Sequence, residues 1–111
     1  MAVISNLVLD QGTNFEIIVR YLNDDGTAID LTGYQARSQM RRSYYSTTAT
    51  NLIANISSPT NGNVTLSLNA NTTANLKVGR YLYDVEVVEN ATYTVSRIVE
   101  GIITVMPEVT K

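Results

Sequence analysis

The chain of 111 residues contains no cysteine, no histidine and no tryptophan. Without cysteine it has no disulfide and no thiolate, so packing and hydrogen bonds must stabilise the fold. Without histidine it lacks the commonest zinc ligand and the commonest general base near neutral pH. We therefore expect no catalytic residue, no metal site, no cofactor and no enzymatic activity.

Lysine occurs only as Lys77 and Lys111, and no apolar run approaches the roughly 18 residues that cross a bilayer. Eight basic and ten acidic residues give a formal net charge of −2, without the basic excess that holds a phosphate backbone. Neither nucleic acid nor a membrane is expected as a partner. The scarcity of lysine has two explanations, a surface covered by partners or a composition bias of the source genome.

The first residues show no basic start followed by a long apolar segment, so a secretory signal is not expected and synthesis in a cytoplasm is the simple interpretation. A hydrophobic share of 44% with 16% charged residues is typical of a folded globular protein. The length suits one hydrophobic core. We expect a single domain over residues 1–111.

The clearest pattern lies between Gly79 and Val88. From Tyr81 onward, tyrosine and valine alternate with leucine, acidic and valine residues, so that one side of the segment is apolar. A period of two is the pattern of a half-buried strand. Similar β-prone segments cover 2–9, 15–22, 34–41, 52–56, 63–69 and 93–103.

About seven short strands with turn signals between them predict an all-β protein, an antiparallel β-sandwich of immunoglobulin-like type, with a small barrel as the alternative. One short helical turn is expected near residues 71–77, capped by Asn71 or Thr72. The alternation slips at Gly101, which predicts a β-bulge there. The N-terminal strand and the strand that ends at Met106 are the expected sheet edges, because neither is strongly guarded by charge.

Gly79 and Tyr81 fall where immunoglobulin-type sandwiches place a turn glycine and a corner tyrosine. In those domains the tyrosine hydroxyl hydrogen-bonds back to the preceding loop. The cysteine that usually follows two residues later is replaced here by Tyr83. The segment therefore predicts the corner that sets the sandwich topology.

Asp84 and Glu86 share one face of the same strand. A paired-carboxylate or metal site needs a third oxygen-rich group or a partner in a different environment, and the sequence supplies neither. In an immunoglobulin-like arrangement the third and sixth strands are neighbours. We therefore expect Arg37 and Arg41 to face Glu86 and Asp84 as cross-strand ion pairs.

A polar segment contains Arg41, at the end of the expected strand over 34–41, and Arg42, Tyr44 and Tyr45, in an expected exposed loop over 42–50. Arginine and tyrosine are the residues that most often anchor protein interfaces. These four side chains are our candidate interface. The alternative is that the arginines end a strand and the tyrosines cover the edge of the core.

Three strings carry a family resemblance. D-L-T-G-Y-x-A-R over 30–37, G-R-Y-L-Y-D-V-E-V over 79–87 and R-I-V-E-G over 97–101 together resemble small immunoglobulin-like structural proteins of tailed, cyanobacterial bacteriophages and the N-terminal domains of baseplate upper proteins. The resemblance spans residues 7–107. It implies fold-determining roles for Gly33 and Gly79 in turns, Tyr81 at the corner, and Arg37 with Glu86 across strands.

The resemblance further implies a non-enzymatic virion protein, most simply a tail or baseplate component, made in the host cytoplasm and assembled into the virion. Its expected partners are other virion structural proteins, with repeated copies in a symmetric assembly. The alternatives are a head or neck decoration protein of the same virion, or a carbohydrate-binding or adhesion module. The larger baseplate proteins continue into receptor-binding regions that the 111 residues do not include.

Overall fold

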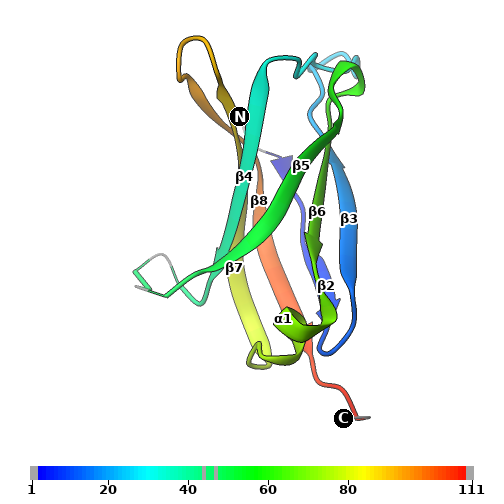
Figure 1. The fold of residues 1–111 in the computed structure, drawn as a ribbon, viewed down its shortest axis with the longest axis vertical. Helices are drawn as coiled ribbons and strands as arrows, with labels where there is room; N and C mark the ends of the chain where they lie inside the picture. Colours follow the sequence, from blue (N-terminus) through cyan, green and yellow to red (C-terminus); the bar gives the residue numbers. More distant parts are fainter. Residues whose placement is uncertain (1–2, 44, 47, 110–111) are drawn as a thin grey trace.

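The computed structural model describes residues 3–43, 45–46 and 48–109. These residues form a β-sandwich whose strands run along its long axis (Figure 1). The fold is all-β and immunoglobulin-like, which confirms the predicted class. The elements, in chain order, are β1 Val3–Ile4, β2 Leu7–Asp10, β3 Phe15–Arg20, β4 Tyr34–Arg41, β5 Thr50–Ser58, the 3₁₀ turn η1 Pro59–Asn61, β6 Asn63–Leu68, α1 Ala70–Ala74, β7 Gly79–Glu89 and β8 Val95–Met106.

Hydrogen bonds join the strands in the order β1-β8-β7-β4-β5-β6-β3, and β2 also pairs with β8. Strand β5 belongs to both layers, because Thr50–Leu52 pair with β4 whereas the segment from Ile53 pairs with β6. The predicted N-terminal strand is divided into β1 and β2, and both run parallel to β8. The other strand pairs are antiparallel.

One prediction about the edges is wrong. Strand β8 lies between β7 and the β1–β2 segment, so it is internal to the sheet. The N-terminal strand does lie at an edge, as expected. The opposite edge is β3, which pairs only with β6 among the described residues. An alternating pattern such as that of β3 is expected both for an edge strand and for an internal strand, so alternation alone does not distinguish the two.

The predicted bulge is present in β8 but at a different residue. The β7–β8 register shifts between Val85, which faces Val99, and Glu86, which faces Arg97, so Ile98 is the extra residue. Both Ile98 and Val99 are buried as a result. Gly101, where we expected the bulge, lies in regular register opposite Tyr83.

The alternating face of β7 lies in the core, where Val85 and Val87 are fully buried and Tyr81 and Tyr83 nearly so. Aliphatic side chains from both layers surround them. The helical turn also forms, but its cap is Asn69, whose side chain accepts a hydrogen bond from the Thr72 N–H at 2.9 Å, and not Asn71 or Thr72. The core consists mainly of Leu7, Leu9, Val19, Leu31, Met40, Leu52, Val64, Leu66, Leu68, Tyr81, Tyr83, Val85, Val87, Ile98, Val99, Ile103 and Val105.

Candidate functional site

The three strings that carry the family resemblance come together on one sheet. The first leads into β4, the second is the first part of β7, and the third lies on β8. Strand β7 pairs with β4 on one side and with β8 on the other. The outward-facing residues of three separate segments, the first more than forty residues from the other two, therefore form one continuous surface, which we call the β4-β7-β8 face.

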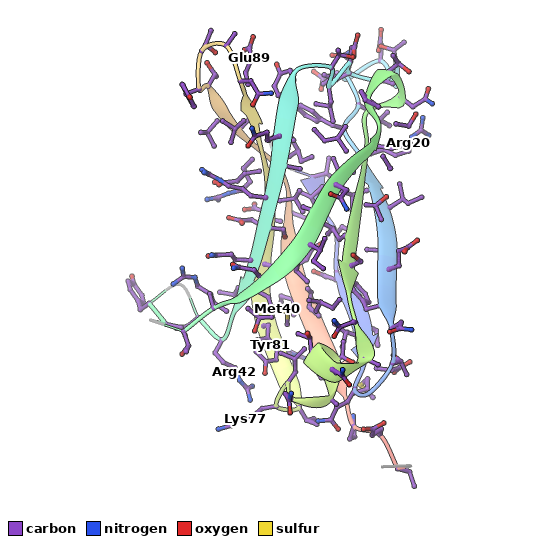
Figure 2. The ribbon with its side chains drawn as sticks, viewed as in Figure 1. Arg20, Met40, Arg42, Lys77, Tyr81 and Glu89 are labelled. Atoms are coloured by element: carbon purple, nitrogen blue, oxygen red, sulfur yellow. The ribbon has the colours of Figure 1, made fainter. Side chains whose placement is uncertain are left out.

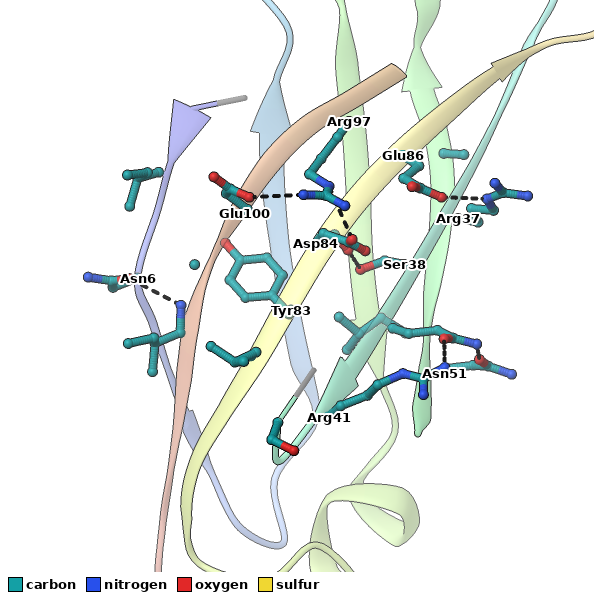
Figure 3. A pocket seen from close by; sticks show the side chains of 18 residues that line it. Asn6, Arg37, Ser38, Arg41, Asn51, Tyr83, Asp84, Glu86, Arg97 and Glu100 are labelled. Carbon is teal, nitrogen blue, oxygen red and sulfur yellow. Dashed lines mark hydrogen bonds and ion pairs between the residues drawn. The ribbon is translucent and has the colours of Figure 1, made fainter. Parts of the chain in front are cut away.

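Ion pairs cross this face (Figure 3). Arg37 lies opposite Glu86 in the register, and its Nε is 2.8 Å from the Glu86 carboxylate, as expected. Arg97 of β8 connects two further acids, with its Nε 3.3 Å from Asp84 and its Nη1 3.3 Å from Glu100. The pairs are partly exposed, so they contribute to strand register more than to total stability.

The expected contact between Arg41 and Asp84 is wrong. The register places Arg41 opposite Leu82 and Asp84 opposite Gln39. Arg41 instead donates through Nη1 to the Ser46 carbonyl oxygen at 2.6 Å and through Nη2 to the Gln39 side chain at 3.1 Å. It therefore fastens the following loop to the strand. The true partner of Asp84 could not be predicted from the sequence, because Arg97 reaches Asp84 only through the shifted register of β8.

Burial raises the pKa of Asp84 above its ordinary value, and the negative charge of Glu86 raises it further, whereas Arg97 opposes the shift. The Asp84 backbone carbonyl accepts a hydrogen bond from the Ser38 hydroxyl, which is buried between β4 and β7. The Asp84 carboxyl is thus partly desolvated, and the charge of Arg97 offsets only part of the resulting rise in its pKa.

A hollow of about 970 Å³ lies over this face, between the β1–β2 segment and the start of β5. Its lining mixes arginines, acids and amides with aliphatic side chains such as Ile4, Leu82 and Ile102. Among the residues that the structure describes, no group of three or more histidine, cysteine, aspartate or glutamate side chains is placed to hold a metal ion.

The predicted corner residues, Gly79 and Tyr81, lie at the start of β7. The Tyr81 hydroxyl donates to the Lys77 carbonyl oxygen at 2.7 Å, which is the predicted bond to the preceding loop. Gly79 has a φ of 135°, and the Arg42 guanidinium fills the space that a Cβ would occupy there. Gly33 has a φ of 84° in the turn before β4, where Tyr34 N–H bonds to Leu31 O at 3.0 Å. Both glycines therefore permit turns that other residues would strain.

Arg42 belongs to this corner. Its guanidinium carbon lies 4.8 Å from the centre of the Tyr81 ring, and its Nη2 donates to the Val78 carbonyl oxygen at 3.1 Å (Figure 2). A guanidinium above an aromatic ring is an attractive cation–π contact. Of the four candidate interface residues, Arg41 and Arg42 therefore make contacts within the chain.

The loop between β4 and β5 extends away from the sandwich (Figure 1). Tyr45 lies on it with 94% of its surface exposed. Tyr44 lies outside the described residues. Among the candidate interface residues that the structure describes, namely Arg41, Arg42 and Tyr45, Tyr45 is therefore the one most available to a partner.

The N-terminal segment is fastened to the sheet by contacts that the sequence analysis missed. Tyr83, in the position usual for cysteine, donates through its hydroxyl to the Ser5 carbonyl oxygen at 2.6 Å. The Asn6 side chain accepts from the Ile102 N–H at 3.1 Å. A Cβ on Gly101 would collide with the Ser5 carbonyl, so the glycine permits close approach of two backbones. The polar pair Ser5 and Asn6 within an apolar run was the available signal.

No helix formed by the described residues is both long enough and apolar enough to cross a lipid bilayer. No protein-family model and no curated protein sequence matches the chain.

Several solved structures are similar in shape. A filamin domain of Lin-41 has a TM-score of 0.40 and 16% identity, covering 82% of this chain and 81% of that one. The natural killer cell receptor Nkp44 has a TM-score of 0.46 and 12% identity, covering 96% of this chain and 99% of that one. A family 123 glycoside hydrolase from Clostridium perfringens has a TM-score of 0.42 and 14% identity, covering 97% of this chain but 24% of that enzyme.

Proposed function

We propose that this chain is a non-enzymatic structural protein of a tailed bacteriophage virion, a tail or baseplate component that binds other virion proteins. The observation that supports the proposal best is the pairing of its three resemblance strings on β4, β7 and β8. Residues 34–41 face 82–89 across one pair of strands, and 97–101 lie on the next strand. Strings that share one surface are consistent with a common structural role.

The exposed residues supply the docking chemistry of this proposal. The β4-β7-β8 face offers arginines and carboxylates over a hollow of about 970 Å³. The adjacent loop offers Tyr45, an aromatic side chain that is 94% exposed. Aromatic and arginine side chains with a polar rim are typical of protein interfaces. Position in the head or neck of the particle, in place of the tail, would use the same surfaces.

The proposal is tested first by mass spectrometry of purified virions from a phage that encodes the protein. We expect the protein in the particles at a constant ratio to other structural proteins, and immunogold labelling at the tail or baseplate. Absence from purified virions would overturn the proposal. Labelling of the head or neck would replace the tail assignment with the decoration alternative.

A photo-crosslinking amino acid placed at Tyr45 then tests the loop. Tyr93 provides the matched control, because it is a tyrosine of the β7–β8 turn that is also highly exposed, at 79%. We expect particles to yield a cross-link from position 45 to another virion protein and none from position 93. Equal cross-linking from both positions would argue against a specific role of the loop.

Tyr45 is also the observation that favours the carbohydrate-binding alternative, since sugar-binding faces are built on exposed aromatic rings. A glycan array with the purified protein distinguishes the two functions. Binding that is lost in Tyr45→Ala and kept in Tyr93→Ala would favour the sugar-binding module. We expect no binding above background.

A further inference from the structure

The outward side chains of the edge strand β3 are an acid, an aliphatic residue and a base in order, so an antiparallel copy of the strand would match each charge with its opposite. Glu16, Ile18 and Arg20 all point outward on one face, and Ile18 is 55% exposed. The residues opposite them on β6 are Ser67, Thr65 and Asn63, which carry no charge. Among the described residues, neither Glu16 nor Arg20 takes part in an ion pair.

The backbone of β3 is also open to a further strand. Tyr21 N–H donates to Gly62 O at 2.8 Å, which sets the phase of the β3–β6 ladder. In an antiparallel ladder, alternate residues direct both their N–H and C=O groups to the same neighbour. The odd-numbered residues of β3 therefore face β6, and Glu16, Ile18 and Arg20 direct their backbone groups to the free edge. Strand β3 contains no proline, and the only charges on its outward face are the opposite charges of Glu16 and Arg20, so this edge is not guarded against pairing.

We propose that β3 pairs with β3 of a second copy of this chain, antiparallel and about a two-fold axis at Ile18. In this register Ile18 lies opposite Ile18 of the second copy, and Glu16 of each copy lies opposite Arg20 of the other. A two-fold interface repeats each contact, so two ion pairs flank one apolar contact. The outward backbone groups of all three residues are used.

Charge selects this register over its neighbours. Moving the axis to Glu16 would place the two Glu16 carboxylates opposite each other, and moving it to Arg20 would oppose the two guanidinium groups. The intermediate registers place Ile18 opposite one charged residue and leave the other without its counterpart. Because like charges directly opposite destabilise a sheet, the axis at Ile18 is the favoured one.

The surrounding surface is compatible with such a pair. Residues 43–76, which include all of β5 and β6, contain no Asp, Glu, Lys or Arg. Pairing at β3 would create one continuous sheet with β5, β6 and β3 from each copy, and its outer face would carry charge only at the seam. The contact is small because β3 has 6 residues, so we expect a weak dimer that repeated copies in an assembly would reinforce.

Charge reversal tests the register. In the proposed register, Glu16→Arg would place an arginine opposite Arg20 of the other copy at both ends of the β3–β3 contact. Arg20→Glu would likewise place a glutamate opposite Glu16 at both ends. We expect each single variant to weaken dimerisation by about tenfold or more, and the double variant Glu16→Arg with Arg20→Glu to recover it to within about threefold of the unaltered chain. Sedimentation velocity over concentrations up to about 1 mM measures the dissociation constant.

A cross-link tests the position of the axis. The chain has no cysteine, so Ile18→Cys introduces a single thiol. Hydrogen-bonded partners in an antiparallel pair have Cα atoms about 5.5 Å apart, within the range of about 4.4–6.8 Å that a disulfide spans. Ile53→Cys is the matched control, because Ile53 is 53% exposed and lies on β5, two strands from the edge. Mild oxidation should give a covalent dimer of the first variant only.

The substituted side chains are exposed, so circular dichroism and thermal unfolding should show that every variant folds like the unaltered chain. An unaltered chain that stays monomeric at the highest concentration would overturn the proposal. So would a double variant that fails to recover dimerisation, or cross-linking of Ile53→Cys as efficient as that of Ile18→Cys. The experiment uses the isolated chain, so its result is independent of whether the protein occurs in virions.

Discussion

Tyr81 combines three contacts at the end of β7. Its hydroxyl donates to Lys77 O at 2.7 Å, its ring lies beneath the Arg42 guanidinium, and 8% of its surface is exposed. The hydroxyl closes the turn that leads into the central strand, and the ring supports the start of the β4–β5 loop. One residue thus links the corner to the loop that we propose as a docking element.

Substitution of Tyr81 by phenylalanine should therefore lower the free energy of unfolding by about 0.5–1.5 kcal/mol, because it removes the hydrogen bond and keeps the ring. Urea unfolding followed by circular dichroism measures the change. Tyr93→Phe is the control, since the Tyr93 side chain is 79% exposed, and its effect should stay within about 0.5 kcal/mol. Equal effects of the two substitutions would show that the corner bond does not stabilise the fold.

Asp84 gives a pH-dependent prediction. Burial raises its pKa in the folded protein above the ordinary value of 3.8, so the folded state binds more protons than the unfolded state between the two pKa values. Stability therefore falls as the pH rises through this window, and the loss is complete above the folded pKa. Asp84→Asn does not titrate, so its stability relative to the unaltered chain should increase as the pH rises from below 3.8 to above the folded pKa of Asp84.

Asp25 provides a control of opposite sign. Hydrogen bonds from the Thr27 hydroxyl and N–H lower the pKa of Asp25 below 3.8, so this residue contributes stability above that value that is lost as the pH falls through the folded pKa. Asp25→Asn should therefore lose stability relative to the unaltered chain as the pH rises. Urea unfolding at a series of pH values measures both, and parallel pH profiles for the two variants would contradict the assignment.

At the scale of elements, the N-terminal segment depends on one close approach. The β1–β2 segment runs parallel to β8 and approaches it closely at Gly101, where the Ser5 carbonyl leaves no room for a side chain. Asn6 accepts a hydrogen bond from Ile102 N–H, and Tyr83 donates one to Ser5. The segment is thus held as one unit by its contact with β8 and β7.

Gly101→Ala should displace this segment and lower the free energy of unfolding by about 1–3 kcal/mol, because the added methyl group meets backbone atoms. Hydrogen exchange locates the effect. We expect the amides of Leu7–Asp10 to exchange faster in the variant, whereas those of Asn63–Leu68 change only with the global stability. Uniform acceleration at both strands would contradict a local role for Gly101.

The elements themselves were largely predictable, because alternation, turn residues and the corner pattern are local signals. What the sequence did not predict depends on pairing. The extra residue at Ile98 places Arg97 beside Asp84 and leaves Arg41 for the loop, and neither outcome follows from spacing within one strand. The sequence also does not show that β8 is internal, because its pairing with β1 and β2 is not visible in either segment alone. Of the candidate site, the Arg37–Glu86 pair was predictable, since both residues lie in regular strands.

At the scale of the whole molecule, β5 connects the two layers. Leu52 pairs with Ser38 of β4, and the next residue, Ile53, pairs with Ser67 of β6. Strand β5 therefore joins the half of the sandwich that contains the β4-β7-β8 face to the half that contains the free edge at β3. Leu52 is 4% exposed at this changeover, within the single core cluster.

Because the two layers share a strand and a core, we expect them to unfold together. Leu52→Ala should therefore lower the free energy of unfolding by about 2–5 kcal/mol, by the same amount for both layers. Tyr21 directly follows β3, bonds to Gly62 and packs against the core, so the fluorescence experiment uses a chain with Tyr21→Phe. Tyrosine fluorescence of that chain reports the layer with Tyr34, Tyr81 and Tyr83, whereas hydrogen exchange of the Asn63–Leu68 amides reports the other layer. The two probes should give the same free energy of unfolding, before and after the substitution. Exchange of the β6 amides at a clearly lower free energy than the fluorescence transition would show that the free-edge layer opens independently, and a dimer formed through β3 would then have to stabilise that layer itself.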